Sequence, residues 1–151
     1  MLKMPGKEAC LKLLEKYEVP SNIVEHSLKV KEVAVNITKK LKEDGEDVNI
    51  DLVRDSAILH DIAKYKCLDN DERHPEEGAR ILREENYPEI AKVISKHGLD
   101  AIIKKEFENW EEKIIYYADK RVKEDKVVSL EERIKDLKKR YPNYQELIRN
   151  V

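Results

Sequence analysis

Ser56-Ala-Ile-Leu-His-Asp-Ile-Ala-Lys64 is the stretch of sequence that decides the fold. Six of these nine residues are apolar or small, so a helix carrying them would be buried on nearly every side. A carboxylate and an imidazole inside that helix, Asp61 and His60, are costly to bury unless something pairs with both. A metal ion is the usual partner, because neutral imidazole nitrogen and carboxylate oxygen are both good ligands. The segment therefore predicts a helical core built around a metal ion.

Composition sets the outer limits of the prediction. The chain has 151 residues, of which 41% are charged and 6% aromatic, and its 32 acidic and 30 basic side chains leave a net charge of -2. This balance gives no basic field that would draw nucleic acid or a membrane surface, so both are disfavoured as partners. Cys10 and Cys67 form no CxxC pair, which predicts two reduced thiols in a cytosolic protein. No apolar run approaches a membrane span and the amino terminus has no signal-peptide layout, so we expect a cytoplasmic protein. Nothing in the sequence specifies an oligomeric state.

Helix signals run along most of the chain, and strand-type alternation is nearly absent. We expect helices over residues 7–17, over 21–44 with Ser21 as N-cap, from 51 through the His60-Asp61 pair, and over 75–85 with Pro75 at the first position. Further helices are expected over 88–97, over 111–126, from a capping box at 129–132, and over 142–149. Residues 45–49 are expected to form a turn and residues 65–73 a loop. The prediction is an all-α fold with a single domain over 1–151, its motif-bearing core over about 21–126 and C-terminal helices over about 129–150.

Two further polar residues lie on apolar helix faces. His26 shares a stripe with Ile23, Val30, Val33, Ile37 and Leu41, and Asp119 shares one with Ile115, Ala118 and Val122. Taken alone, His26 is better explained as a hydrogen-bonded core histidine, and Asp119 as a structural hydrogen bond or a buried ion pair. Four polar groups are nevertheless predicted to be buried in one small interior when His60 and Asp61 are included. One shared site explains them better than four unrelated structural roles.

The remaining candidates are less specific when taken one at a time. His74 and His97 lie at predicted helix boundaries, where a surface or capping histidine is the simpler explanation. Gly78 could let the backbone approach a ligand or could simply allow close packing. Lys64 follows Asp61 by about one helical turn, so it is either a surface residue or a positive charge held over a metal-bound phosphate.

The order His26, His60-Asp61, Asp119 resembles the H…HD…D signature of the HD-domain metal-dependent phosphohydrolases, over residues 23–122. The segment Leu59-His-Asp-Ile-Ala-Lys64 is similar to the motif core of the HDIG-type branch. His74-Pro-Glu-Glu-Gly78-Ala and Ile94-Ser-Lys-His97-Gly match the two extra histidine motifs of binuclear members. Every histidine in the chain therefore falls on a motif position, and the set is similar to that of the bacterial diadenosine tetraphosphatases.

The resemblance implies an all-helical domain around one or two divalent transition metals. His26, His60, Asp61 and Asp119 would hold the first metal, and Asp61 would bridge to a second one held also by His74 and His97. Lys64 corresponds to the family's phosphate-facing lysine, which makes Asp61 and Lys64 the expected catalytic residues. Iron or manganese is favoured from the family, while imidazole and carboxylate ligands also suit nickel, cobalt and zinc.

The expected activity is hydrolysis of a phosphoester or phosphoanhydride in a nucleotide-like small molecule, through a metal-activated water. Residues 65–73, between Lys64 and His74, are a candidate lid or substrate wall. The alternative is a regulatory module that binds metal and nucleotide with little turnover. A purely structural helical protein is the weakest hypothesis, because it treats all four histidines as coincidence.

Overall fold

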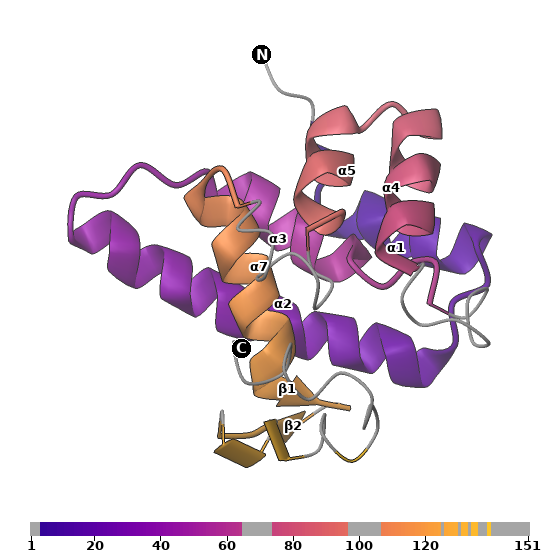
Figure 1. The fold of residues 1–151 in the computed structure, drawn as a ribbon. Helices are drawn as coiled ribbons and strands as arrows, with labels where there is room; N and C mark the ends of the chain where they lie inside the picture. The colour runs from indigo at the N-terminus through magenta and orange to yellow at the C-terminus, as the bar shows by residue number, and fades with distance from the viewer. Residues whose placement is uncertain are drawn as a thin grey trace.

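The computed structural model describes residues 4–64, 74–96, 107–124 and 126–129, together with residues 131–132, 134–135 and 139. Within these residues the chain is almost wholly helical, which confirms the all-α prediction (Figure 1). The elements are α1 (Lys7–Lys16), α2 (Ser21–Glu43), α3 (Ile50–Leu59), α4 (His74–Glu84), α5 (Pro88–Ile94), α7 (Trp110–Arg121), β1 (Val122–Lys123) and β2 (Lys126–Val127).

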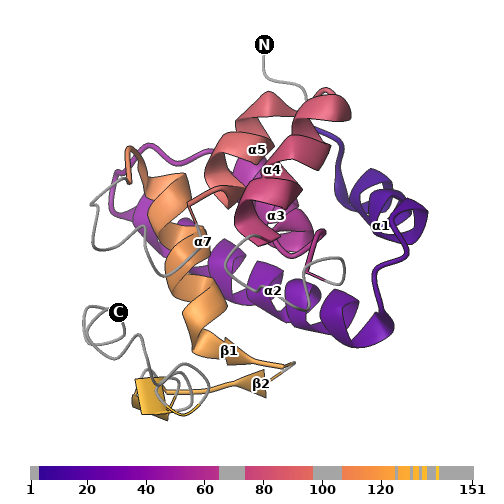
Figure 2. The same ribbon diagram turned by 45° about the vertical axis from the view of Figure 1, so that its right-hand side comes forward.

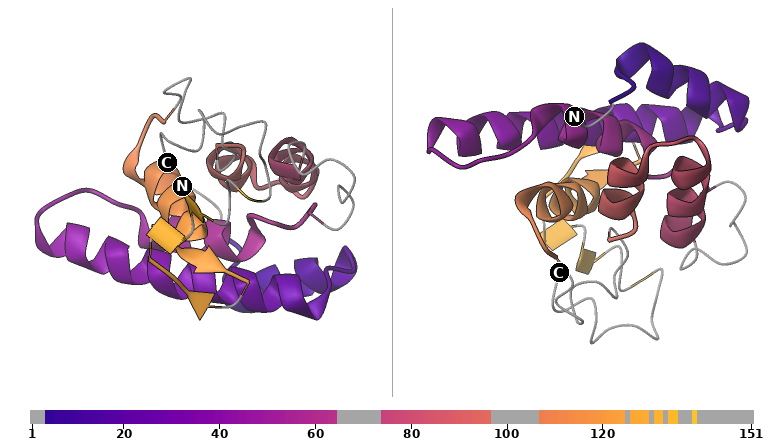
Figure 3. Two further views of the ribbon diagram at one scale, coloured as in Figure 1. Left: turned by 60° about the horizontal axis from the view of Figure 1, so that its bottom comes forward. Right: turned by 90° about the horizontal axis from the view of Figure 1, so that it is seen from above.

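Helix α3 lies at the centre of the arrangement and contacts α1, α2, α5 and α7. The long helix α2 runs along one side of the molecule and α7 crosses it, while α4 and α5 form an adjacent pair (Figure 2). Seen from above, α1 and α2 lie on one side, and α4, α5 and α7 on the other (Figure 3). The segment that follows α3 therefore lies between elements that are far apart in the sequence.

The stretch 55–63 is buried at every residue, as its composition predicts. The prediction that one helix carries His60 and Asp61 is wrong, because α3 ends at Leu59. Beyond it the backbone tightens into bonds between residues three apart, from Ile62 N to Leu59 O at 3.1 Å and from Lys64 N to Asp61 O at 3.0 Å. This turn places two polar residues at the end of a helix and still inside the core.

Helix starts differ from the sequence expectation by small shifts. Ser21 is the first residue of α2 and not its N-cap, because Pro20 holds the cap position in an extended conformation without a side-chain cap. Asn49 caps α3 by accepting from Leu52 N, so that helix begins one residue before the predicted Asp51. Helix α4 likewise begins at His74, which puts Pro75 second. The predicted turn over residues 45–49 is present, with Gly45 at φ 92°.

The predicted helix over 111–126 is the largest error. Helix α7 starts at Trp110, where Asn109 Oδ1 accepts from Glu112 N and Glu112 Oε1 accepts from Glu108 N. It stops at Arg121, and a hairpin follows in which Val122 pairs with Val127. The Arg121 guanidinium donates to the Val128 carbonyl at 2.7 Å, and Val128 N donates to the Arg121 carbonyl at the same distance. These two hydrogen bonds hold the chain against the end of α7, and the helix does not continue.

Other predictions have mixed outcomes. On α2, Ile23, His26 and Val30 are buried as expected, but the later part of the buried face is Ala34 and Thr38. Val33, Ile37 and Leu41 are only partly buried beside it. Helix α5 ends at Ile94, earlier than predicted, and is followed by a turn. The expected cap bond from Glu132 N to Ser129 Oγ is present at 3.1 Å.

Several predictions fall outside the described residues: the loop over 65–73, the helix over 142–149, Cys67 and His97. Within the described part, Cys10 is a free, buried thiol. Burial is the main cause that raises its pKa, and the neighbouring Asp55 carboxylate adds to the effect, in keeping with a reduced cysteine.

No helix among the described residues combines the length and the apolar character that crossing a bilayer requires.

Gly78 serves close packing. A Cβ at this position would lie 3.2 Å from Ile94 Cδ1 and 3.5 Å from Ile62 Cγ2. The missing side chain therefore lets α4 approach both α5 and the turn that carries His60 and Asp61.

We expect Gly78→Val to destabilise the protein by about 1–3 kcal/mol, because the added methyl groups overpack this contact. Arg83→Val on the exposed side of the same helix is the matched control and should stay within about 0.5 kcal/mol of wild type. Urea unfolding followed by circular dichroism measures both. Equal stabilities for the two variants would contradict the packing role of Gly78.

Candidate metal centre

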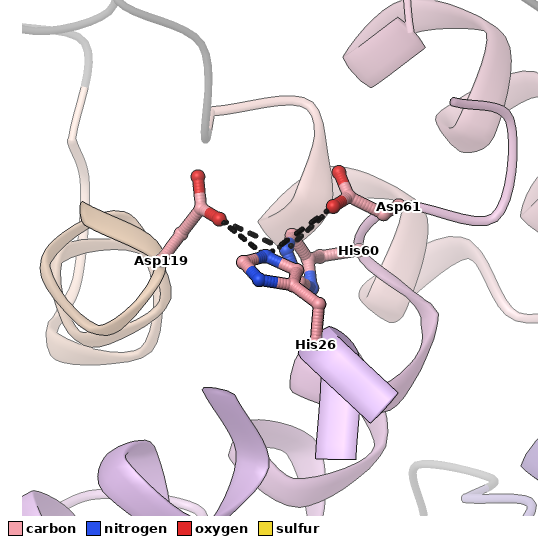
Figure 4. A group of neighbouring side chains, drawn as sticks. All are labelled: His26, His60, Asp61 and Asp119. Carbon is pink, nitrogen blue, oxygen red and sulfur yellow. Dashed lines mark hydrogen bonds and ion pairs between the residues drawn. The ribbon is translucent and has the colours of Figure 1, made fainter. Parts of the chain in front are cut away.

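Four polar side chains from three separate segments meet in the core (Figure 4). His26 comes from the first third of α2, His60 and Asp61 from the turn after α3, and Asp119 from the last third of α7. Each offers one ligand atom, and these atoms all lie within 4.8 Å of one another. The side chains are buried, with exposed fractions of 7%, 0%, 3% and 7% in that order. The sequence-predicted set for the first metal is therefore brought together.

The distances between the donor atoms fit a divalent transition metal. Asp119 Oδ1 lies 3.1 Å from His26 Nε2 and 3.2 Å from His60 Nε2. Asp61 Oδ2 lies 3.5 Å from His26 Nε2 and 3.3 Å from His60 Nε2. Ligands bound at about 2.0–2.2 Å in tetrahedral geometry are separated by about 3.4 Å. The four nitrogen–oxygen separations are thus close to those of atoms that share one cation.

Both imidazole rings are turned so that Nε2 faces the cluster. The other ring nitrogen of His60 lies 2.7 Å from the Ala57 carbonyl, and that of His26 lies against the Glu124 carbonyl. Because a carbonyl only accepts, each Nδ1 must carry a proton. In a neutral ring this leaves the lone pair on Nε2, which is the arrangement that metal-binding histidines adopt. A lone pair aimed at a carboxylate is repulsive unless a cation or a proton lies between them.

Lys120 completes the surroundings of Asp119, and the sequence analysis did not identify it. Its ammonium lies 3.0 Å from Asp119 Oδ2 and 4.6 Å from the centre of the Tyr116 ring, and the residue is only 5% exposed. Asp119 therefore divides its two oxygens, with Oδ1 toward the histidines and Oδ2 toward Lys120. Helical periodicity could not reveal this contact, because residues adjacent in a helix point about 100° apart.

Asp61 also uses its two oxygens in two directions. While Oδ2 faces His26 and His60, Oδ1 lies 3.1 Å from His74 Nε2. The His74 side chain is 14% exposed and stands at the first residue of α4. A carboxylate that bridges two cations would direct its oxygens in this way, so the position of His74 is compatible with the predicted second cation. His97, the other predicted ligand there, lies outside the described residues.

Charge in the cluster is balanced by protons when no metal is bound. Burial alone would lower the pKa of His60, but Asp61 and Asp119 act in the opposite direction and raise it to about 10. Burial alone would raise the pKa of Asp119, but Lys120, His26 and His60 hold it well below its usual value. The Asp119 carboxylate thus stays ionised in the core, and a metal must displace a proton from His60 to bind.

Lys64 ends the same turn as Asp61 and is half-buried. Within the part of the chain that the structure describes it forms no ion pair. Its assignment as a charge facing a substrate phosphate stays a prediction.

The comparisons with known proteins agree with this geometry. The model of the HD domain family matches residues 23–140, so the chain belongs to the HD domain family, as its motif order predicted. An uncharacterised protein of Methanocaldococcus jannaschii is 33% identical over 132 residues, which cover 79% of this chain and 77% of that protein. No solved structure matches the chain.

Two other relatives are longer proteins named tRNA (cytidine(56)-2'-O)-methyltransferase. The one from Thermoplasma volcanium is 36% identical over 95 residues, covering 62% of this chain and 26% of that protein. The one from Picrophilus torridus is 28% identical over 153 residues, covering 93% of this chain and 42% of that protein. The chain thus spans less than half the length of both methyltransferase relatives.

Asp61→Ala should cost more metal affinity than any other single change, because Asp61 is the residue that faces both predicted cations. Since outer-shell changes already cost about 10–100-fold, loss of this ligand should exceed about 100-fold. His74→Ala should keep one tightly bound equivalent. Competition titration with a metal indicator measures both.

Asp51→Ala removes the same charge from an exposed position on α3 and serves as the control for Asp61→Ala. Equal metal affinity in Asp61→Ala and Asp51→Ala would contradict the assignment of the ligands.

The metal-free protein should lose stability as pH rises. The raised pKa of His60 stabilises the fold fully below the ordinary histidine value of 6.5, and this contribution is lost as pH approaches about 10. We expect the urea midpoint to fall between about pH 7 and about pH 9.5, and to fall less in His60→Gln. Identical pH profiles for the two proteins would show that His60 does not hold the extra proton.

Proposed function

We propose that this protein is a metal-dependent phosphohydrolase that cleaves a phosphoester or phosphoanhydride of a nucleotide-like small molecule. The observation that carries the proposal is the buried cluster of two imidazole nitrogens and two carboxylate oxygens on His26, His60, Asp61 and Asp119. Membership of the HD domain family supports the same class of chemistry. The sequence similarity to the HDIG-type branch and to the diadenosine tetraphosphatases favours a nucleoside polyphosphate as substrate.

A divalent metal in this cluster would polarise a phosphoryl oxygen and lower the pKa of a bound water. The residues of the cluster would bind this metal from different directions. His26, His60 and Asp119 would hold it together with one oxygen of Asp61, and the other oxygen of Asp61 points toward His74. Imidazole and carboxylate donors without thiolate suit iron or manganese, which we favour, and also nickel, cobalt and zinc.

Lys64 is proposed to bind the substrate phosphate. It lies in the turn that starts at Asp61, and its flexible stem can carry a positive charge toward oxygens bound beside that residue. A protonated lysine cannot act as a ligand, so its contribution is to offset negative charge as the attack proceeds.

The alternative is a regulatory module that binds metal and nucleotide with little turnover. The two relatives named as methyltransferases favour this alternative. The region similar to this chain covers 26% and 42% of their lengths, so in each relative it is one part of a larger protein. In such a protein an HD-type part could sense a nucleotide while another part performs the named reaction. The two functions differ in turnover and not in ligand binding.

A substrate screen separates these proposals. The protein, reconstituted with manganese or with iron(II), is incubated with nucleoside mono-, di- and triphosphates, dinucleoside tetraphosphates and cyclic nucleotides. Hydrolysis products are separated by anion-exchange chromatography, because symmetrical cleavage of a dinucleoside tetraphosphate and ring opening of a cyclic nucleotide release no inorganic phosphate. Tightly bound nucleotide is measured by calorimetry. Turnover that His60→Ala abolishes and Asp51→Ala preserves would establish the hydrolase, whereas binding without turnover would establish the regulatory module.

For the active substrate, Lys64→Ala should leave metal content intact and lower kcat by about 30-fold to 1,000-fold, which corresponds to about 2–4 kcal/mol of lost electrostatic stabilisation. Lys12→Ala, which removes an equal charge from the exposed side of α1, should turn over like wild type. Rates are compared at matched metal loading. A Lys64→Ala enzyme within twofold of wild type would remove this residue from the mechanism.

A further inference from the structure

The two histidines of the metal centre are held in different ways. His60 donates from Nδ1 to the carbonyl of Ala57, three residues earlier in the same segment. His26 donates from Nδ1 to the carbonyl of Glu124, 98 positions further along the chain. The orientation of the His60 ring is therefore local, while that of His26 depends on a tertiary contact with the hairpin after α7.

The hairpin is tight and well anchored. Lys123 pairs with Lys126, and Glu124 follows β1 directly in the turn between the two strands. At the open end of the hairpin Val122 is fully buried, and Val128 exchanges two hydrogen bonds with Arg121. Both β1 and β2 contact α2, the helix that carries His26. The position of the turn is thus fixed relative to the ring that it contacts.

The backbone at Glu124 is unusual for its residue type. Its φ is 59°, in the left-handed region that glycine and asparagine favour in two-residue hairpins. A glutamate held in this conformation costs conformational energy that the surrounding contacts must offset. The direction of the carbonyl that accepts from His26 follows from this conformation. The side chain of Glu124 is exposed and takes no part in the contact.

We propose that the hairpin turn at Glu124 is a positioning element of the metal centre. Its backbone carbonyl fixes the His26 ring with the proton on Nδ1, so that the Nε2 lone pair faces Asp61 and Asp119. Glu124 is a positioning residue that acts through His26 and through its main chain alone. The inference rests on the metal centre of the proposed function but not on turnover, so it can be tested on metal binding alone.

The test uses zinc, which is diamagnetic, and the whole 151-residue chain. Zinc affinity is measured by competition with an indicator, and nitrogen-15 spectra of the zinc-loaded protein report which ring nitrogen of His26 carries the proton. Wild type should show a protonated Nδ1 that exchanges slowly and a zinc-bound Nε2. Glu124→Pro, whose φ near -65° cannot adopt the native turn, should weaken zinc binding by about 10–100-fold. Its His26 Nδ1 proton should exchange rapidly.

Two controls isolate the main chain. Glu124→Gly accepts the left-handed conformation and should bind zinc within twofold of wild type, although it lacks the side chain. Lys126→Ala changes an exposed residue of the same hairpin and should have no effect. Circular dichroism shows whether the Glu124→Pro protein has folded. If it has not, the nitrogen-15 spectra of the zinc-loaded wild-type protein test the proposal by themselves.

The outcomes are distinct. A wild-type His26 ring that binds zinc through Nδ1 would overturn the proposal whatever the variants do. So would a folded Glu124→Pro protein with unchanged affinity and an unchanged His26 spectrum, although the metal centre itself would stand. A wild-type chain that takes up no zinc, manganese or iron would overturn both this inference and the proposed function.

Discussion

Two carboxyl groups buried opposite two imidazoles are the constraint on which the rest of this structure depends. Asp61 and Asp119 are 3% and 7% exposed, and unpaired charges at such depth would be too costly to keep. Positive charge must therefore be supplied inside the core by Lys120, by a proton on His60, or by a metal. Each source requires a particular segment in a particular place, which explains why three distant parts of the chain converge on one point.

The helical framework meets this requirement through α3, which contacts four other helices. Its apolar residues bury the segment, and the turn after Leu59 then presents His60 and Asp61 without a continuing helix to separate them. Gly78 allows α4 to approach that turn, which brings His74 within 3.1 Å of Asp61. Packing and chemistry are thus coupled, because the same close contact that fills the core also places the ligand expected for a second cation.

The sequence predicted the helices and the four clustered ligands because both leave a side-chain signature. His26 and Asp119 stand among apolar residues at helical spacing, and His60-Asp61 interrupts a run of small and apolar ones. The hairpin after α7 left no such signature, since the sequence around Glu124 is charged and could continue a helix. The sequence cannot indicate which carbonyl orients His26, because every residue has a backbone carbonyl. Lys120 was missed since lysine next to aspartate in a helix is ordinarily a surface pair, and only burial beside Tyr116 makes it part of the centre.

The charge balance of the cluster bears on what it can bind. Without metal, the Lys120 ammonium and the proton on His60 supply positive charge beside Asp61 and Asp119. A divalent cation that displaces this proton brings one more positive charge into a largely buried site than the proton did. Lys64, three residues after Asp61 in the same turn, adds a further positive charge to this segment of the chain. Metal loading would then make the centre more attractive to anions, such as the phosphate groups of the proposed substrate. Metal binding and substrate binding are therefore expected to be coupled through charge, without any change in the fold.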